Sequence, residues 1–198
     1  MTSVLLTAFD AYGPWDENSS WLTLIELTRN LPDRPTVTTR RYPVDFQAMR
    51  ECLARDLDAN YDFAIHMGQA PGRGRIELEA IGLNVAGKPD QHPDEFFKLA
   101  EEGAVAYRSD LPLAEWSAKL RKAGIPCQVS YIAGTYLCNA TLYLSHFLAE
   151  QKSLTTRSVF IHLPLDVSQV LASRKDSATM TAATMAAAIR LLLDELAG

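Results

Sequence analysis

The stretch "YIAGTYLCNATLYLSHFLAE", residues 131–150, places a cysteine at the junction between a strand-like segment and a helix-like segment. The apolar run from Val129 to Ala133 predicts the end of a strand, and Gly134 predicts a turn. From Leu137 to Glu150, apolar residues recur every three or four positions, which predicts a helix. The buried stripe of that helix is expected to include Leu144, Phe147 and Leu148.

Cys138 falls in the first turn of this predicted helix. Unpaired backbone N–H groups and the positive end of the helix dipole would there lower the pKa of the thiol and make the sulfur nucleophilic. The alternative is a small core residue, because free cysteine is among the residue types most often buried. The spacing alone favours the core residue, so a nucleophile needs support from other residues.

Strand-like and helix-like segments alternate along the chain. The predicted strands are Val4–Phe9, Phe63–Gly68, Gln128–Ala133 and Val159–Leu163. The first predicted helix is capped by Ser19 or Ser20 and has Trp21, Leu24 and Ile25 on one face. The second begins at Asp45 and has Phe46, Met49, Leu53 and Leu57 at helical spacing. The third is Leu113–Lys122, and the last runs from about Ser177, its cap, to Ala197. This alternation predicts an α/β fold with a largely parallel sheet.

Residues 75–85 alternate in a way that predicts a further strand with two carboxylates on one face, Glu77 and Glu79. Glu77 lies nearer the preceding loop and is expected to be solvated. Glu79 lies two residues from Ile81 and is expected to be partly buried, so it needs a partner. The segment from Ala86 to Asp94 contains two prolines and predicts a loop.

Length and composition limit the classes of function. With 198 residues, 47% of them hydrophobic, the chain is expected to form one domain over residues 1–198. A net charge of −5 without a basic run predicts no binding to nucleic acid or to an anionic membrane, and no apolar run is long enough for a membrane helix. The first apolar run is too short for the core of a signal peptide, so we expect a cytoplasmic protein with reduced cysteines and a small-molecule or peptide partner.

Four histidines are candidates for acid–base chemistry: His66, His92, His146 and His162. His66 and His162 approach the carboxyl ends of predicted strands, where open α/β sheets place their ligand sites, although each could be a hydrogen-bonded core residue. No spacing typical of metal ligands connects the histidines with cysteines or carboxylates, so we expect no metal. Cys138, His162 and Glu79 supply the thiol, the imidazole and the orienting carboxylate of a cysteine peptidase.

The chain resembles the pyroglutamyl peptidase I family of cysteine peptidases in a series of colinear segments. They are "LLTAFDAYG" and "ENSSW" near the N-terminus, "YPVDF", "HMGQAPGRGRIELEAIGLNV", "AGTYLCNATLYLSH" and "FIHLP". The resemblance implies an α/β/α sandwich of the phosphorylase/hydrolase-like type with a twisted, largely parallel mixed sheet. It also implies removal of N-terminal pyroglutamate from peptides without a cofactor, in homodimers or homotetramers.

The same resemblance implies roles for single residues. Cys138 is similar to the family nucleophile, His162 to its general base and acid, and Glu79 to the residue that orients the histidine. The implied substrate-binding residues are Phe9, Tyr12, Gln69, Tyr136, Leu137 and Lys88.

Two departures from the family pattern concern the site. Tyr12 stands where the second phenylalanine of the family is usual, and no arginine follows Val85, so Lys88 is the nearest cation. We expect residues 86–94 to form a mobile flap in which Lys88 partly replaces that arginine. Two other functions remain open: a pyroglutamate-binding module with weak turnover, and a nucleotide-handling protein that uses "GQAPGRG" as a phosphate cradle, although this loop lacks the P-loop lysine and serine or threonine.

Overall fold

The structure, a computed structural model, describes residues 2–173 and 176–197. Its main sheet has six strands in the order β2-β1-β3-β8-β4-β7. The bounds of these strands are β1 Ser3–Phe9, β2 Thr36–Tyr42, β3 Phe63–Gln69, β4 Ile76–Glu79, β7 Cys127–Ser130 and β8 Arg157–Leu163. All neighbouring strands run parallel except β4 and β8, which are antiparallel, so the predicted largely parallel mixed sheet is confirmed.

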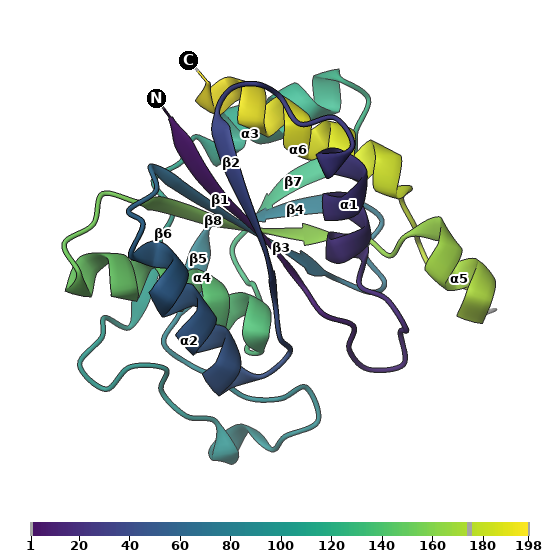
Figure 1. Cartoon of the computed structure of the whole chain (residues 1–198). Helices are drawn as coiled ribbons and strands as arrows, with labels where there is room; N and C mark the ends of the chain where they lie inside the picture. The colour runs from purple at the N-terminus through teal and green to yellow at the C-terminus, as the bar shows by residue number, and fades with distance from the viewer. Residues whose placement is uncertain (1, 174–175, 198) are drawn as a thin grey trace.

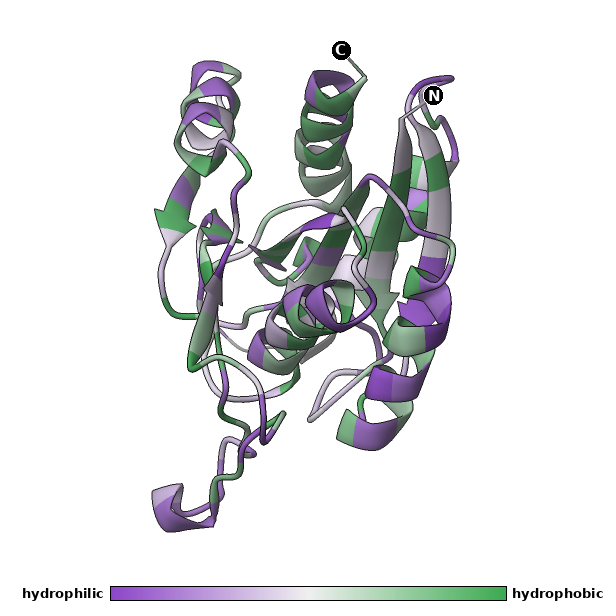
Figure 2. Ribbon diagram, turned by 90° about the vertical axis from the view of Figure 1, so that its left-hand side faces the viewer, coloured by the Kyte–Doolittle hydropathy of each residue, from purple (hydrophilic) through white to green (hydrophobic). Residues whose placement is uncertain are grey.

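Helices cover both faces of this sheet (Figure 1). Their bounds are α1 Ser19–Thr28, α2 Phe46–Leu57, α3 Leu113–Lys122, α4 Leu137–Gln151, α5 Val167–Ser173 and α6 Ala182–Leu196. Helices α1, α3 and α6 share one apolar core with the sheet, and α2 and α4 share the other. In Figure 2 the C-terminal helix α6 carries long stretches of hydrophobic residues, because its apolar side packs against α1 and α3.

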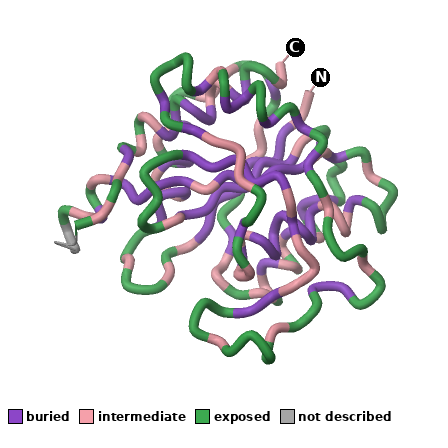
Figure 3. The backbone as a smooth tube through the Cα atoms, turned by 180° about the vertical axis from the view of Figure 1, so that it is seen from behind, coloured by how far each residue is buried: buried purple, intermediate pink, exposed green. Residues whose placement is uncertain are grey.

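Alternation along the central strands divides their side chains between the two cores. In β1, Val4, Leu6 and Ala8 join the core of α1, α3 and α6, whereas Leu5 and Phe9 join the core of α2 and α4. The central strands are buried along most of their length, and the loops that connect the elements are exposed (Figure 3). Polar side chains at the carboxyl ends of these strands therefore lie at the edge of the buried part of the sheet.

The predictions for α2, opened by Asp45, and for α3 are confirmed. Two predicted caps are wrong. Asn18, rather than Ser19 or Ser20, caps α1 by accepting a hydrogen bond from the Ser20 N–H. Thr181, rather than Ser177, caps α6, because the chain before it is extended and pairs Thr179 with Leu165.

Other boundaries also differ from the prediction. Strand β7 ends at Ser130 rather than Ala133, and Tyr131 and Ile132 are exposed, because β7 is an edge strand with no neighbour to extend the ladder. Ile25 is 37% exposed and does not share the buried face of α1 with Leu24. Residues 75–85 form two strands, β4 and then β5 Ile81–Leu83, which pairs with β6 Ala106–Arg108 in a separate small sheet.

Among the described strands and α-helices, β2, β6 and α5 had no sequence prediction. Strand β2 is a polar edge strand, and its sequence "TVTTRRY" has no apolar alternation to reveal it. The loop predicted for residues 86–94 is present, with a short 3₁₀ helix, Pro93–Glu95, at its end. Across its base Ala86 pairs with Phe97, which ties the two ends of the loop together.

Candidate active site

Cys138 is the second residue of α4 and is partly buried. The chain reaches the helix through a turn at Gly134, whose φ is +82°, a value that suits glycine. Tyr136 precedes the helix in an extended conformation and gives no side-chain capping hydrogen bond. The first N–H groups of α4 therefore have no side-chain cap at the end where the helix dipole is positive.

Gly68 lets the nucleophile segment approach the sheet closely. A Cβ added at this glycine would lie 3.2 Å from Cys138 Sγ and 2.5 Å from the ring of Phe160. Gly68 pairs with His162 across the parallel strands β3 and β8. The thiol therefore sits against the carboxyl ends of the two central strands of the sheet.

His162 and Glu79 form a close pair beneath the thiol. His162 Nδ1 donates to Glu79 Oε1 at 2.7 Å, and the Glu79 side chain is fully buried. Burial alone would lower the pKa of His162. The charge of the Cys138 thiolate and its hydrogen bond to the ring, together with Glu79, more than offset burial and raise that pKa to about 10. The three predicted catalytic residues therefore lie in one hydrogen-bonded series that favours an imidazolium at His162.

Glu77 is buried, with 1% of its surface exposed, so its predicted solvation is wrong. It lies opposite His162 across the antiparallel strands β4 and β8, and its Oε1 accepts hydrogen bonds from Gln128 Nε2 at 2.6 Å and Arg73 Nη1 at 3.4 Å. These partners compensate the buried charge.

Glu77, Glu79 and His162 each offer a donor atom, and these atoms lie within 4.8 Å of one another, a spacing that could also hold a metal ion. However, the ring of His162 already bonds to Glu79 through Nδ1 and interacts with Cys138. A metal ion would have to displace one of these two interactions. We therefore assign these residues to the His162–Glu79 pair and not to a metal site.

A cavity of about 480 Å³ opens above the thiol. Cys138, His162 and five of the predicted substrate-binding residues line it: Phe9, Tyr12, Gln69, Tyr136 and Leu137. Lys88 is exposed and does not line the cavity in this structure, although the next residue, Pro89, does. The cation that lines it is Arg73, an exposed residue that the sequence analysis did not select.

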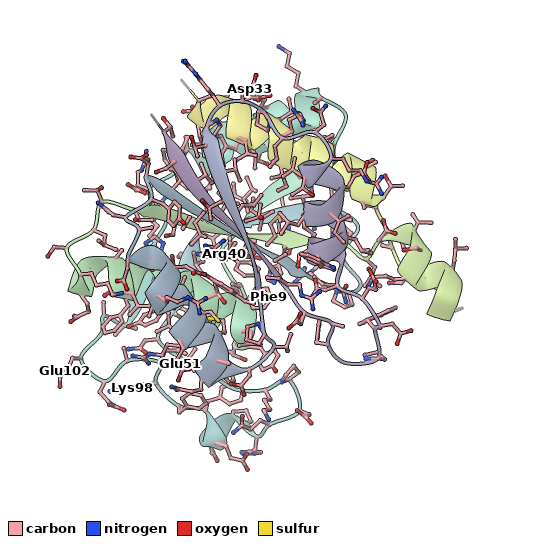
Figure 4. All side chains as sticks on the ribbon, in the orientation of Figure 1. Phe9, Asp33, Arg40, Glu51, Lys98 and Glu102 are labelled. Carbon is pink, nitrogen blue, oxygen red and sulfur yellow. The ribbon has the colours of Figure 1, made fainter. Side chains whose placement is uncertain are left out.

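The aromatic wall of the cavity combines core and surface residues. Phe9, labelled in Figure 4, is 3% exposed at the end of β1. Its ring packs against that of Phe160, with 6.3 Å between the ring centroids. Tyr12 is half-buried. Burial, followed by the nearby Cys138 and Tyr136, raises the pKa of its phenol to about 12, so the phenol remains a neutral hydrogen-bond donor.

Three more polar residues contribute to the site. Asn18 lines the cavity and lies in the segment "ENSSW", so the resemblance to the family offered a signal for it. Asn139, next to Cys138, accepts from the Leu83 N–H at 2.8 Å and donates to Val85 O at 2.8 Å. It therefore ties the segment after Glu79 to the helix that carries the thiol. Gln169 bonds to Gln69 from α5, and no pattern in the sequence indicated it.

His66, the other histidine at a strand end, is a buried core residue. Its ring bonds to Thr7 Oγ1 at 2.8 Å and to Ser145 Oγ at 3.1 Å. Burial, followed by the nearby His146, lowers the pKa of His66 to about 3, so its ring is neutral at pH 7. Both ring nitrogens form hydrogen bonds with hydroxyl groups, so His66 is a hydrogen-bonded core residue.

Within residues 2–173 and 176–197, we find no helix with the length and apolar character needed to cross a bilayer.

Comparisons with known proteins agree with this geometry. The family model for pyroglutamyl peptidase matches residues 2–196. The pyrrolidone-carboxylate peptidase of Brevibacillus brevis is 33% identical over an alignment that covers 98% of this chain and 92% of the relative. That of Thermococcus onnurineus is 35% identical, with 85% and 86% covered.

Solved structures give the same answer for the fold. The crystal structure of pyrrolidone carboxyl peptidase from Fervidobacterium islandicum matches with a TM-score of 0.92 and 30% identity, covering 99% of this chain and 98% of that one. A mutant pyrrolidone carboxyl peptidase from Pyrococcus furiosus matches with a TM-score of 0.90 and 29% identity, with the same coverage. On the family model, the relatives and the fold together, the chain belongs to the pyroglutamyl peptidase family.

Proposed function

We propose that this peptidase removes N-terminal pyroglutamate from peptides through a Cys138–His162–Glu79 triad and a thioester intermediate. The observation that carries the proposal is the hydrogen-bonded series from Glu79 through His162 to Cys138, located at the base of a cavity beside an uncapped helix N-terminus. A thiolate paired with an imidazolium is the resting form that a cysteine nucleophile needs.

The first half of the reaction forms the thioester. The Cys138 thiolate attacks the carbonyl carbon that joins the lactam ring to the next residue, and a carbon–sulfur bond forms. The developing oxyanion accepts hydrogen bonds from the N–H groups of the first turn of α4. His162 then gives its proton to the leaving amine as the carbon–nitrogen bond breaks.

The second half of the reaction releases pyroglutamate. His162, now neutral, takes a proton from water, and the resulting hydroxide attacks the thioester carbonyl. The carbon–sulfur bond breaks and the thiolate is restored beside the imidazolium. Glu79 keeps the imidazole in one orientation and favours its charged form throughout.

The cavity suits a lactam because a pyroglutamyl residue has no free ammonium group to neutralise. Aromatic side chains contact the ring faces, and Gln69 provides directed hydrogen bonding. The nucleophile must remain a free thiol, and Cys52, Cys127 and Cys138 are all free, so we place the reaction in a reducing cytoplasm. We infer one catalytic domain, since both cores pack on one continuous sheet.

Hydrolysis of a pyroglutamyl fluorogenic amide, with and without iodoacetamide, tests the proposal. We expect wild-type protein to hydrolyse the amide and alkylation to stop it, with mass spectrometry locating the label on Cys138. Cys138→Ser is expected to be inactive, whereas the matched variants Cys52→Ser and Cys127→Ser keep their activity.

Activity that survives in Cys138→Ser would rule out the triad. If the wild-type protein binds pyroglutamate without hydrolysing the amide, the protein is a pyroglutamate-binding module. Lys88, the predicted substitute for the family arginine, lies outside the cavity lining, and this position favours that alternative.

A further inference from the structure

A second hollow, of about 450 Å³, adjoins the catalytic cavity, and we call it the outer hollow. The residues that line it come from the loop between β3 and β4 and from the position before β7; they are Gly72, Arg73, Gly74, Arg75 and Pro126. Arg73 also lines the cavity above the thiol, so the two hollows share this side chain. Among the described residues that line either hollow, none is a carboxylate.

The outer hollow carries an excess of positive charge. Arg73 Nη1 and Arg75 Nε lie 3.4 Å and 3.8 Å from the same oxygen, Glu77 Oε1, so one buried carboxylate faces two guanidinium groups. In the part of the chain that the structure describes, neither guanidinium has a hydrogen-bond or ion-pair partner other than Glu77. Each of the two side chains is 53% exposed, so their remaining N–H groups are open to an anion from a ligand.

The position of Glu77 gives the direction from the triad to these arginines. Glu77 lies opposite His162 across β4 and β8, and donor atoms of the two residues lie within 4.8 Å of each other. In the proposed reaction His162 gives its proton to the leaving amine, so the first residue of the leaving peptide lies beside His162. Arg73 and Arg75 pair with Glu77 and therefore lie on the side of the leaving peptide.

We propose that the outer hollow selects peptides in which Asp or Glu directly follows pyroglutamate, and that Arg73 and Arg75 bind the side-chain carboxylate of that residue. This inference rests on the proposed function, because it assumes that the cavity holds the pyroglutamyl residue. A guanidinium presents its N–H groups in a planar fork that matches a carboxylate, whereas the amide of Asn or Gln carries no charge to attract it. Arg75 lines only the outer hollow, so its replacement separates this selection from the chemistry in the cavity.

The test compares two pairs of peptides by kcat/KM, measured from the pyroglutamate released. Pyroglutamyl-Asp-Ala amide and pyroglutamyl-Asn-Ala amide differ only in the side-chain carboxylate. Pyroglutamyl-Ala and its amide differ only in the α-carboxylate of a chain end, the other source of the same anion. We expect wild-type protein to prefer the Asp peptide to the Asn peptide about fivefold at low ionic strength, the upper range for partly exposed ion pairs. Salt at about 1 M should remove most of this preference.

Replacement of Arg75 should change the preference without changing the basal reaction. In Arg75→Gln we expect the ratio of the Asp to the Asn peptide to fall to about twofold or less, with the Asn peptide hydrolysed at nearly the wild-type kcat/KM. Arg75→Glu should reverse the ratio, because like charges then meet. Arg108→Gln removes an exposed arginine that lines neither hollow, and this matched control should keep the wild-type ratio. A general loss of activity or stability cancels in the ratio, because the two peptides share every other group.

Three results overturn the inference alone: equal hydrolysis of the Asp and Asn peptides by wild-type protein, a preference for Asp that survives in Arg75→Glu, or a preference confined to the chain-end carboxylate. If the Arg75 variants fail to fold, the wild-type ratio at low and high salt decides. A wild-type protein that hydrolyses none of the four peptides overturns the proposed function as well.

Discussion

At the scale of single residues, the environment of His162 matters more than its place in the sequence. The ring loses water on burial, yet Glu79 on one side and Cys138 on the other favour its charged form. The outcome is a raised pKa, and therefore an imidazolium that persists at neutral pH. His66, on the neighbouring strand, is buried among hydroxyl groups instead, and its pKa moves in the opposite direction.

Replacement of Glu79 tests the electrostatic part of this arrangement. Glu79→Gln keeps an oxygen that can accept from Nδ1 but removes the negative charge, so the pKa of His162 should fall. In the proposed mechanism the imidazolium protonates the leaving amine, so we expect activity to be lost as pH rises through this pKa. The alkaline limb of the kcat/KM profile should therefore move to lower pH, with kcat reduced by about a hundredfold at neutral pH. An alkaline limb that does not move would show that Glu79 has no electrostatic part in the reaction.

A second prediction concerns the two cations near the site. Arg73 lines the cavity and pairs with the buried Glu77, although 53% of its side chain is exposed. Lys88 lies outside the cavity lining on the loop 86–94, and we expect that loop to close before Lys88 can reach the reacting atoms. We expect Lys88→Ala to reduce kcat by roughly tenfold, less than the loss of a well-placed oxyanion donor. Arg73→Ala should reduce kcat/KM by more than Lys88→Ala does. Steady-state kinetics of both variants on one substrate checks the order, and the reverse order would move the functional cation to the loop.

At the scale of secondary-structure elements, the antiparallel strand β4 builds the acidic side of the site. Its register with β8 places Glu77 opposite His162 and Glu79 opposite Phe160, so both carboxylates share a face with the histidine. The chain then leaves the main sheet after Glu79 and pairs with β6. A continuous strand through residues 75–85, as the alternation predicted, would not have allowed Asn139 to hold the next segment against α4.

Gly68→Ala tests the close approach of α4 to the sheet. The added Cβ would meet the fully buried Phe160 ring at 2.5 Å and Cys138 Sγ at 3.2 Å. We expect a loss of about 1–3 kcal/mol in the free energy of unfolding and a lower kcat/KM, because the thiol is pushed from His162. Gly74→Ala, whose Cβ meets only an ordinary contact at 3.4 Å, is the matched control. Urea unfolding and substrate hydrolysis measure both effects, and equal behaviour of the two variants would contradict the prediction.

The start of α6 offers a test of a helix boundary. Thr181 Oγ1 accepts from the Thr184 N–H at 3.1 Å, so Thr181→Ala should lower the free energy of unfolding by about 1 kcal/mol. Ser177 lies before the helix begins, so Ser177→Ala should have a smaller effect, within about 0.5 kcal/mol. Thermal or urea unfolding of the two single variants decides between Thr181 and Ser177 as the helix cap. A larger loss of unfolding free energy in Ser177→Ala than in Thr181→Ala would favour the predicted cap at Ser177.

At the scale of the whole molecule, the site lies where two cores meet the edge of one sheet. The triad residues are on the side of α2 and α4, while Gln69 turns toward α1 and α5 on the other side. A series of buried side-chain hydrogen bonds also links the sheet to α4. It runs from Thr7 through His66 and Ser145 to Ser158, and so joins β1, β3, α4 and β8.

Protonation of His66, within this series of hydrogen bonds, should lower the stability of the fold in acid. The folded-state pKa of His66 is lowered to about 3, well below the value of an exposed histidine, so the unfolded chain binds the proton first. The contribution of neutral His66 is complete above about pH 6.5 and is lost as pH falls, at about 1.4 kcal/mol per pH unit. His66→Asn cannot titrate, so its free energy of unfolding should fall less steeply between about pH 6.5 and 4.5. Urea unfolding across this range measures the slope, and equal slopes in wild type and variant would contradict it.

The sequence by itself determined most of the helices and the buried strands, the turn that delivers Cys138 to a helix N-terminus, and the identity of the candidate triad through its resemblance to a family. It did not reveal β2, β6 or α5. Local periodicity carries this information, because it reports which face of each segment is apolar. Tertiary structure alone decided the partners of the polar residues. His162 and Glu79 are 83 positions apart, and Gln69 and Gln169 are 100 apart, so no local pattern could reveal their contacts. For the same reason the burial of Glu77, the approach of Arg73 to the cavity and the cap at Thr181 emerged only from the folded chain, since each depends on which distant segments the sheet brings together.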